Sequence, residues 1–101
     1  MIVYNTTYTM HNDDARNFVI WATEVLIPRA QRSEKRRKGR MLRIISHHDQ
    51  ETECFSIQFE VQDNKVLHEW YVSEGAALVK ELEQTFQGKV VGFSTLMSDD
   101  F

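Results

Sequence analysis

Hydrophobic and polar residues alternate with a period of two over residues 54–61, so that one face is apolar and the other is polar without being fully charged. This period is typical of a strand with one buried face. A second strand-like run covers residues 41–46, and the polar segment 47–53 separates the two. The pattern predicts a β-hairpin. Its core-facing positions are Phe55, Ile57, Phe59 and Val61.

Residues at both ends of the chain also follow the period of two that is typical of strands. Residues 1–10 are rich in β-branched and aromatic side chains, and residues 89–97 alternate again after the turn at Gln87 and Gly88. Such composition favours strands. The sequence therefore predicts a first and a last strand outside the hairpin.

Two stretches have the helical period instead. After a cap at Asn12 or Asp13, apolar residues recur at i, i+3, i+4 and i+7 from Phe18 onward, until Pro28 ends or kinks the helix before a short turn over 29–32. A second helix, capped by Asp63, carries an apolar stripe that closes at Phe86. Residues 73–75 interrupt it and predict a kink or break.

The order strand, helix, strand, strand, helix, strand is that of the split βαβ, ferredoxin-like sandwich. We therefore expect an α+β fold, βαββαβ, with a four-stranded antiparallel sheet in the order 4-1-3-2 and two helices on one face. A chain of 101 residues suits a single domain, 1–101.

The helices leave the other face of this sheet open. A mixed polar and apolar face suits a second subunit or an enclosed ligand better than open solvent. We predict a homodimer formed through it, with four side chains converging on a small-molecule ligand. The predicted open face holds Val3, Asn5, Thr7, Thr9, Ser56, Gln58, Glu60, Val90, Gly92, Ser94 and Leu96. The candidate ligand-binding residues are Asn5, Thr7, Gln58 and Ser94.

Three histidines, His11, His47 and His48, fall at one rim of the predicted sheet, together with the acids Asp49, Glu51 and Glu53. Imidazole and carboxylate groups suit zinc or iron. Neighbouring residues on a strand point to opposite faces, however, so at most one of His47 and His48 joins His11. These histidines are weak metal candidates, and we predict neither a metal site nor a cofactor.

Residues 29–43 hold eight of the twelve basic residues and one acid, a local charge of +7 in a chain of net charge −3. The rest of the chain is strongly acidic, which disfavours a general nucleic-acid surface. RNA recognition on this fold also needs aromatic residues on the open face of the central strands, and the predicted face lacks them. We expect no nucleic-acid partner. The candidate basic patch is Arg32, Lys35, Arg36, Arg37, Lys38 and Arg40.

Other motifs are missing from the sequence. Cys54 is the only cysteine, so neither an internal disulfide nor a thiol zinc cluster can form. No nucleophile and base pair, glycine-rich phosphate loop, basic leader or long apolar run is evident. We expect a cytoplasmic protein without a membrane span, and we assign no catalytic residue.

Several short motifs resemble a family of short bacterial proteins classed as a domain of unknown function, within the dimeric α/β-barrel, ferredoxin-like superfamily. They lie at residues 1–7, Trp21, Ile27-Pro28, residues 55–59 and residues 93–97. The resemblance implies the fold and a dimer but transfers no catalytic residue. We expect a homodimeric small-molecule-binding or interaction module. The alternative is a monooxygenase-like, dimeric α/β-barrel enzyme that acts on a small organic substrate between sheet and helices.

Overall fold

A computed structural model describes residues 1–32 and 37–101, apart from the side chains of Arg37 and Lys38. In this part of the chain, four strands form one antiparallel sheet in the order β2-β3-β1-β4. The predicted order 4-1-3-2 is the same order counted from the other edge, and it is confirmed. The strands are β1 (Ile2–His11), β2 (Arg37–Arg43), β3 (Thr52–Val61) and β4 (Val91–Ser98).

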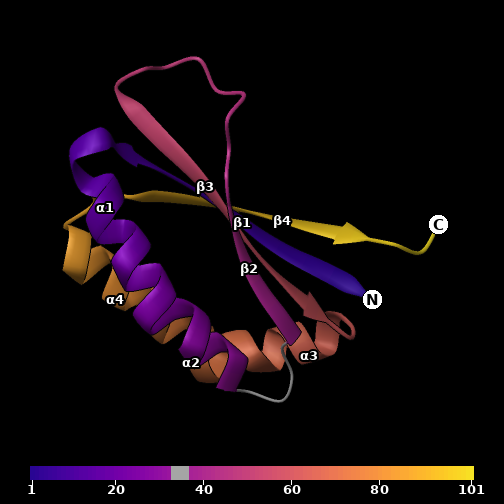
Figure 1. The fold of residues 1–101 in the computed structure, drawn as a ribbon. Coiled ribbons are helices and arrows are strands. Elements are labelled where there is room, and N and C mark those ends of the chain that lie inside the picture. The colour runs from indigo at the N-terminus through magenta and orange to yellow at the C-terminus, as the bar shows by residue number, and fades with distance from the viewer. Residues whose placement is uncertain (33–36) are drawn as a thin grey trace.

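Two long helices lie on one side of this sheet (Figure 1). Each consists of two α-helical parts joined by a π turn. The first comprises α1 (Asn12–Trp21), the π turn η1 (Ala22–Leu26) and α2 (Ile27–Arg32). The second comprises α3 (Asn64–Trp70), the π turn η2 (Tyr71–Gly75) and α4 (Ala76–Phe86). The predicted α+β sandwich is therefore confirmed.

Pro28 does not end the first helix. In the π turn the Ile27 N–H bonds to the Ala22 carbonyl five residues back, and the Thr23 hydroxyl donates to the Val19 carbonyl at 2.8 Å. In an ordinary α-helix a proline lacks the N–H for one hydrogen bond, and its ring clashes with the carbonyl of the residue four positions earlier. The wider π turn lies just before Pro28, where it relieves this conflict. The helix thus continues through Arg32.

The interruption predicted at residues 73–75 is the second π turn. The Ser73 hydroxyl donates to the Glu69 carbonyl at 2.9 Å, just as Thr23 does in the first helix. A Cβ on Gly75 would lie 2.5 Å from Cζ3 of Trp70. Glycine is therefore required there by the close approach of the Trp70 ring.

The two helix N-termini are capped differently. Oδ1 of Asp63 accepts from the Val66 N–H at 2.9 Å, as predicted. The first helix is capped instead by His11, whose Nδ1 accepts from the Asp13 N–H at 3.0 Å. Asn12, a predicted cap, donates to the Gln50 carbonyl at 2.7 Å and ties the β2–β3 connection to the helix.

Replacing Asp63 with alanine is expected to lower the free energy of unfolding by about 1 kcal/mol, because the Val66 N–H loses its acceptor. Asp63→Asn keeps a side-chain oxygen at this position and serves as the control. Urea denaturation of the three proteins measures the effect. Equal stability of the alanine and asparagine variants would show that the cap contributes nothing.

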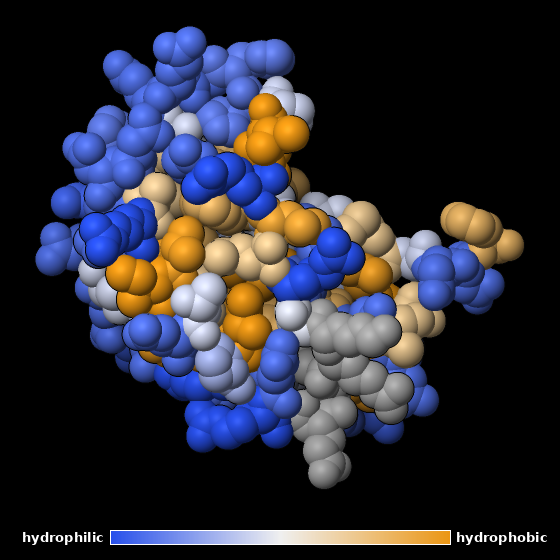
Figure 2. All heavy atoms as spheres, viewed as in Figure 1, coloured by the Kyte–Doolittle hydropathy of each residue, from blue (hydrophilic) through white to orange (hydrophobic). Residues whose placement is uncertain are grey.

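The core lies between the helices and the inner face of the sheet. Phe55, Ile57, Phe59 and Val61 of β3 are buried, as the alternation predicted. On the side shown in Figure 2, hydrophobic side chains gather near the middle of the molecule, and hydrophilic ones cover the β2–β3 connection at the top. Other buried residues of the core are Met10, Phe18, Ala22, Leu26, Ala30, Trp70, Leu78, Leu82, Phe86 and Val90.

The predicted faces of the last strand are wrong. In the observed register Thr6 lies opposite Ser94 and Thr7 opposite Phe93, so Ser94 faces the helices and Phe93 faces outward. A Cβ on Gly92 would lie 3.1 Å from the Tyr8 ring, which occupies the space below this strand. The β4 residues on the open face of the sheet are Val91, Phe93, Thr95 and Met97. Gly92, Ser94 and Leu96 lie on the inner face, and Val90, just before the strand, is buried.

The first arm of the hairpin is also shifted, because β2 ends at Arg43 rather than at Ser46. Residues 44–51 connect it to β3.

None of the helices in the described part of the chain has the length and apolar composition that crossing a membrane requires.

Candidate functional site

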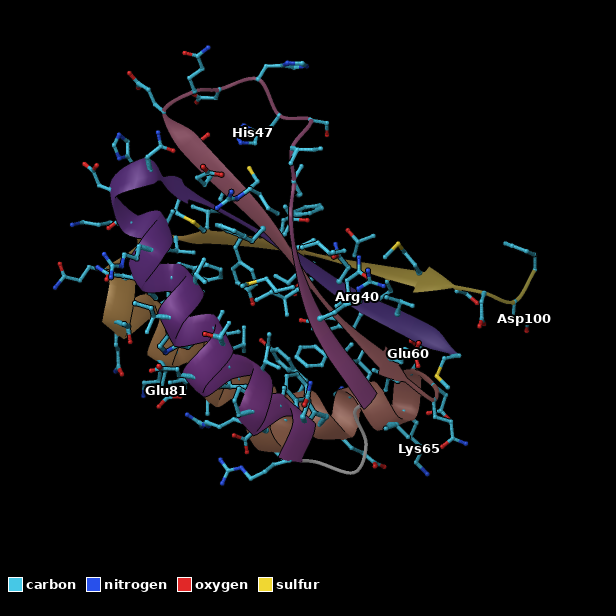
Figure 3. The ribbon with its side chains drawn as sticks, viewed as in Figure 1. Arg40, His47, Glu60, Lys65, Glu81 and Asp100 are labelled. Carbon is cyan, nitrogen blue, oxygen red and sulfur yellow. The ribbon has the colours of Figure 1, made fainter. Side chains whose placement is uncertain are left out.

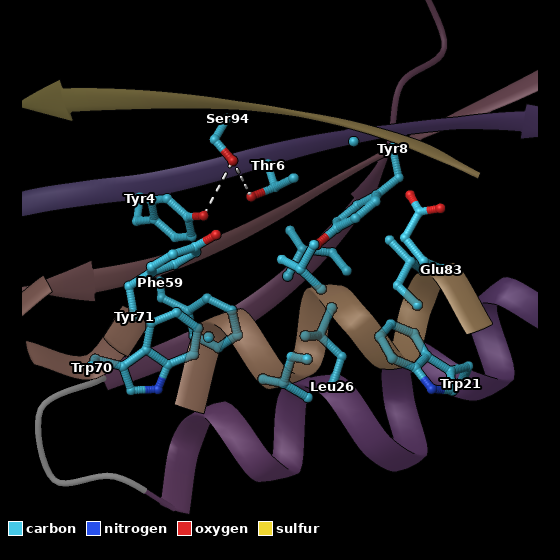
Figure 4. A pocket seen from close by; sticks show the side chains of 16 residues that line it. Tyr4, Thr6, Tyr8, Trp21, Leu26, Phe59, Trp70, Tyr71, Glu83 and Ser94 are labelled. Atoms are coloured by element: carbon cyan, nitrogen blue, oxygen red, sulfur yellow. Dashed lines mark hydrogen bonds between the residues drawn. The ribbon is translucent and has the colours of Figure 1, made fainter. Parts of the chain in front are cut away.

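A pocket of about 150 Å³ lies between the inner face of the sheet and the helices. Figure 4 shows Tyr4 and Tyr71 at one end of it and Tyr8, Trp21 and Glu83 at the other. Strands β1, β3 and β4 form one wall, and α4 with the two π turns forms most of the other. Six of the lining residues are aromatic: Tyr4, Tyr8, Trp21, Phe59, Trp70 and Tyr71.

Small residues line this pocket at the edge of the sheet and on the helix side. Gly92 and Ser94 are the lining residues that β4 contributes, and neither has a side chain long enough to reach the helices. Gly75 in η2 lines the pocket from the helix side. The two glycines let the Tyr8 and Trp70 rings lie close to the backbone as walls of the pocket.

Three hydroxyl groups form a polar cluster on the sheet wall of the pocket. The Ser94 hydroxyl shares a hydrogen bond of 3.0 Å with the Thr6 hydroxyl and one of 3.2 Å with the Tyr4 hydroxyl (Figure 4). A hydroxyl both donates and accepts, so this cluster can reorient to meet either kind of ligand group. It is the polar anchor in a largely apolar cavity.

Arg29 ties the two helices together. Its guanidinium donates to Glu74 at 3.0 and 3.1 Å and also to Glu81, which is labelled in Figure 3. Partial desolvation lowers the pKa of Arg29, but the hydrogen bonds and charges of Glu74 and Glu81 outweigh it, so the pKa lies above its ordinary value. This link fixes α2 against η2 and α4, and thereby the helix wall of the pocket.

Three of the four predicted ligand-binding residues, Asn5, Thr7 and Gln58, lie together on the open face of the sheet. Ser56 connects them: it donates to Asn5 and accepts from Nε2 of Gln58 at 3.2 Å, while Nδ2 of Asn5 donates to Thr7 at 3.4 Å. These groups bond to one another. Ser94 lies on the opposite face, in the pocket, so the predicted group of four does not form one site.

Exposed apolar side chains flank this polar network. Phe93 and Val91 on β4 are 73% and 65% exposed, and Met97 on β4 and Leu42 on β2 are also exposed. Arg40 lies opposite Gln58 on β2 and so shares its face. The open face is therefore polar at its centre and more apolar at its edges.

The predicted rim does bring His11 near the β2–β3 connection, since His11 pairs with Thr52 and the Asn12 N–H bonds to the Glu51 carbonyl at 2.9 Å. Figure 3 shows His47 between this connection and β3. His11 is occupied as a helix cap, and His48 is exposed. Among residues 1–32 and 37–101, no three histidine, cysteine or acidic side chains are placed to hold a metal ion.

The basic patch can be described only in part. Arg32 at the end of α2 and Arg40 on β2 are exposed. Lys35 and Arg36 lie outside the described residues, as do the side chains of Arg37 and Lys38. In the central strands, β1 and β3, the open face presents Asn5, Thr7, Ser56 and Gln58 rather than aromatic residues.

The sequence predicted a small-molecule site between sheet and helices only in the enzyme alternative, and it assigned no lining residues there, because aromatic residues at core spacing are ordinarily packing residues. One signal was present: the inner face of β1 carries Tyr4, Thr6 and Tyr8, three hydroxyl-bearing residues where a sealed core favours aliphatic ones. Buried hydroxyls need partners. A run of them on an inner face indicates a polar cavity.

A family model described as a domain of unknown function, DUF4286, matches residues 1–99. The chain belongs to the DUF4286 family. The resemblance predicted from the short motifs is thereby confirmed. No curated protein matches this DUF4286 chain.

Three solved structures share the fold of the DUF4286 chain. One, from Deinococcus radiodurans, is named a "putative antibiotic biosynthesis monooxygenase"; it has a TM-score of 0.76 and 10% identity over 100% of this chain and 94% of its own. An ethyl tert-butyl ether d (ethd) family protein from Bacillus halodurans has a TM-score of 0.69 and 13% identity over 98% and 99%. A dimeric ferredoxin-like protein from an uncultured marine organism has a TM-score of 0.57 and 15% identity over 99% and 95%. Identities this low establish the shared fold and no activity.

Proposed function

We propose that this DUF4286 chain binds a small organic molecule in the pocket between sheet and helices, and that it works as a homodimer joined through the open sheet face. The observation that carries the first part is the hydroxyl cluster of Tyr4, Thr6 and Ser94 in a largely apolar cavity. A sealed core gains nothing from such a cluster. A binding site uses it to orient one polar group of a ligand.

The pocket volume limits the size of the ligand. An apolar cavity of about 150 Å³ accommodates a molecule the size of benzene, and the volume here is about 150 Å³. We therefore expect a compact ligand with one ring or a short branched chain, and with one polar group directed at Ser94.

A substitution at the pocket wall tests this proposal. Val79 on α4 lines the pocket and is 48% exposed, so Val79→Trp can fill part of the cavity without disrupting the core. Val72→Trp, at a position that is 68% exposed and does not line the pocket, is the matched control.

Thermal denaturation is measured with a panel of one-ring alcohols, phenols and amines. We expect at least one compound to raise the melting temperature of the wild type and of Val72→Trp but not of Val79→Trp, since only a ligand of the native state stabilises it. Stabilisation that survives in Val79→Trp, or none with any compound, would contradict a ligand in this pocket.

The homodimer is supported by the composition of the open face. Its centre is internally hydrogen-bonded through Ser56, and its edge carries exposed Phe93 and Val91. Exposed apolar groups of this kind are typical of surfaces that become covered. A structural neighbour of similar fold is a dimeric ferredoxin-like protein, which supports a dimer but not a particular interface.

A monooxygenase-like enzyme is the second candidate. The name of the neighbour from Deinococcus radiodurans supports it. Oxygen uptake and mass spectrometry with each pocket ligand test this candidate. A ligand that gains one oxygen atom and loses two hydrogen atoms, which leave with the second oxygen atom of O₂ as water, supports it because no added reductant is needed, and unchanged ligand under air contradicts it.

A further inference from the structure

The pocket has one charged lining residue among those that the structure describes, and that residue is acidic. Glu83 on α4 lines the end of the pocket where Tyr8 lies, and Figure 4 shows its carboxylate directed toward the sheet. No lysine, arginine or histidine of the described chain lines this pocket. The charge that the cavity presents to a ligand is therefore negative.

Glu83 differs from other acids on the same helical segment. Glu74 and Glu81 both pair with Arg29. Within residues 1–32 and 37–101, no ion pair involves the Glu83 carboxylate. Its charge is thus available to a ligand at the edge of a partly enclosed, low-dielectric cavity, where an opposite charge is attracted more strongly than in open water.

The rest of the lining also favours a cation. Six aromatic residues line the cavity, and two of them, Tyr8 and Trp21, lie at the same end as Glu83 (Figure 4). The faces of aromatic rings attract ammonium groups, and boxes of such rings recognise organic cations. The hydroxyl cluster at Ser94 lies toward the Tyr4 end of the cavity, so it is left for a second polar group of the natural ligand (Figure 4).

We propose that the pocket selects small organic amines, with the ammonium group held among the aromatic rings and Glu83 and the apolar body in the remaining space. This inference rests on the proposed function, since it specifies the ligand of the same pocket. A carboxylate ligand is disfavoured on the same grounds: it would face Glu83 with no basic residue of the described lining to pair with it.

Calorimetric titration with matched compounds of nearly equal shape tests the sign of the charge. Benzylamine, benzyl alcohol and benzoate form one set, and cyclohexylmethylamine, cyclohexylmethanol and cyclohexanecarboxylate the other. We expect each amine to bind about tenfold more tightly than its alcohol, a difference of the size that a partly desolvated cation gains from rings and a carboxylate. The carboxylates should bind most weakly.

Glu83→Gln removes the charge at an exposed position and should reduce the affinity for the amines about five- to tenfold while leaving that for the alcohols unchanged. Glu24→Gln, which makes the same change at an exposed position outside this pocket, is the control and should change neither.

The outcomes separate the two proposals. Alcohols that bind as well as the amines, with loss of binding in Val79→Trp, would overturn the charge selectivity and keep the pocket. Unchanged amine affinity in Glu83→Gln would likewise overturn the role of Glu83. No binding by any of the six compounds would overturn both proposals.

Discussion

Phe93→Asp is expected to convert the protein from a dimer to a monomer. Phe93 lies on the outward face of β4, opposite Thr7, and is 73% exposed in the single chain. In the proposed dimer this ring becomes covered by the partner's sheet. A carboxylate at the same place would be desolvated without a partner, which costs several kcal/mol.

Size-exclusion chromatography with light scattering measures the effect at tens of micromolar protein. The wild type should have twice the 11.9 kDa mass of one chain, and Phe93→Asp should have that of one chain. Val72→Asp places the same charge on an exposed apolar position of η2, on the helix side, and should stay dimeric. A monomeric wild type, or a dimeric Phe93→Asp, would contradict the open-face dimer.

Phe18→Ala is expected to cause the largest loss of stability, about 3–5 kcal/mol in the free energy of unfolding. Phe18 is completely buried. Its ring centroid lies 4.9 Å from that of Tyr8, 5.9 Å from that of Phe55 and 6.0 Å from that of Phe86. Truncation therefore leaves a void where strands β1 and β3 meet both helices, and it removes support from Tyr8, which lines the pocket.

Urea denaturation measures this loss. Phe101→Ala, at the exposed end of the chain, should change stability by no more than about 0.5 kcal/mol. Phe18→Leu retains much of the volume and should fall between the wild type and Phe18→Ala, which keeps the test informative if the alanine variant does not fold. Equal effects of Phe18→Ala and Phe101→Ala would contradict the role of Phe18 as the centre of the core.

The fold could be predicted because its signals are local. The alternation of Phe55, Ile57 and Phe59 fixes the buried face of β3, and Asp63 caps the second helix as its sequence position indicates. The order of elements then leaves few topologies. Pro28 was expected to end or kink the first helix, and it does not end it, because the π turn that precedes it accommodates the proline. Sequence periodicity does not reveal such a turn.

The faces of β4 could not be predicted from that strand alone. Apolar residues occur at both alternating sets of positions in this region: Val91 and Phe93 would lie on one face, and Val90 and Leu96 on the other. The choice depends on a neighbour distant in sequence: the Tyr8 ring needs the space that only Gly92 leaves. Ser94 was therefore grouped with the wrong side chains.

The lining of the pocket could not be predicted for a similar reason, although the enzyme alternative placed a substrate between sheet and helices. The tyrosines and tryptophans have the spacing of ordinary core residues, and Gly75 and Gly92, from separate elements, let the Trp70 and Tyr8 rings lie close to the backbone. Such close approaches are a tertiary property. The hydroxyls of β1 were the one local indication.

Nuclear Overhauser contacts between a bound amine and the protein test the central claim most directly, because they locate the ligand. With benzylamine present in excess, we predict contacts from its ring protons to the ring protons of Trp21, Tyr8 and Tyr4, which line the pocket. Contacts to Phe93 or Leu42 on the outer side of the sheet, or a complete absence of contacts, would contradict a ligand site between sheet and helices.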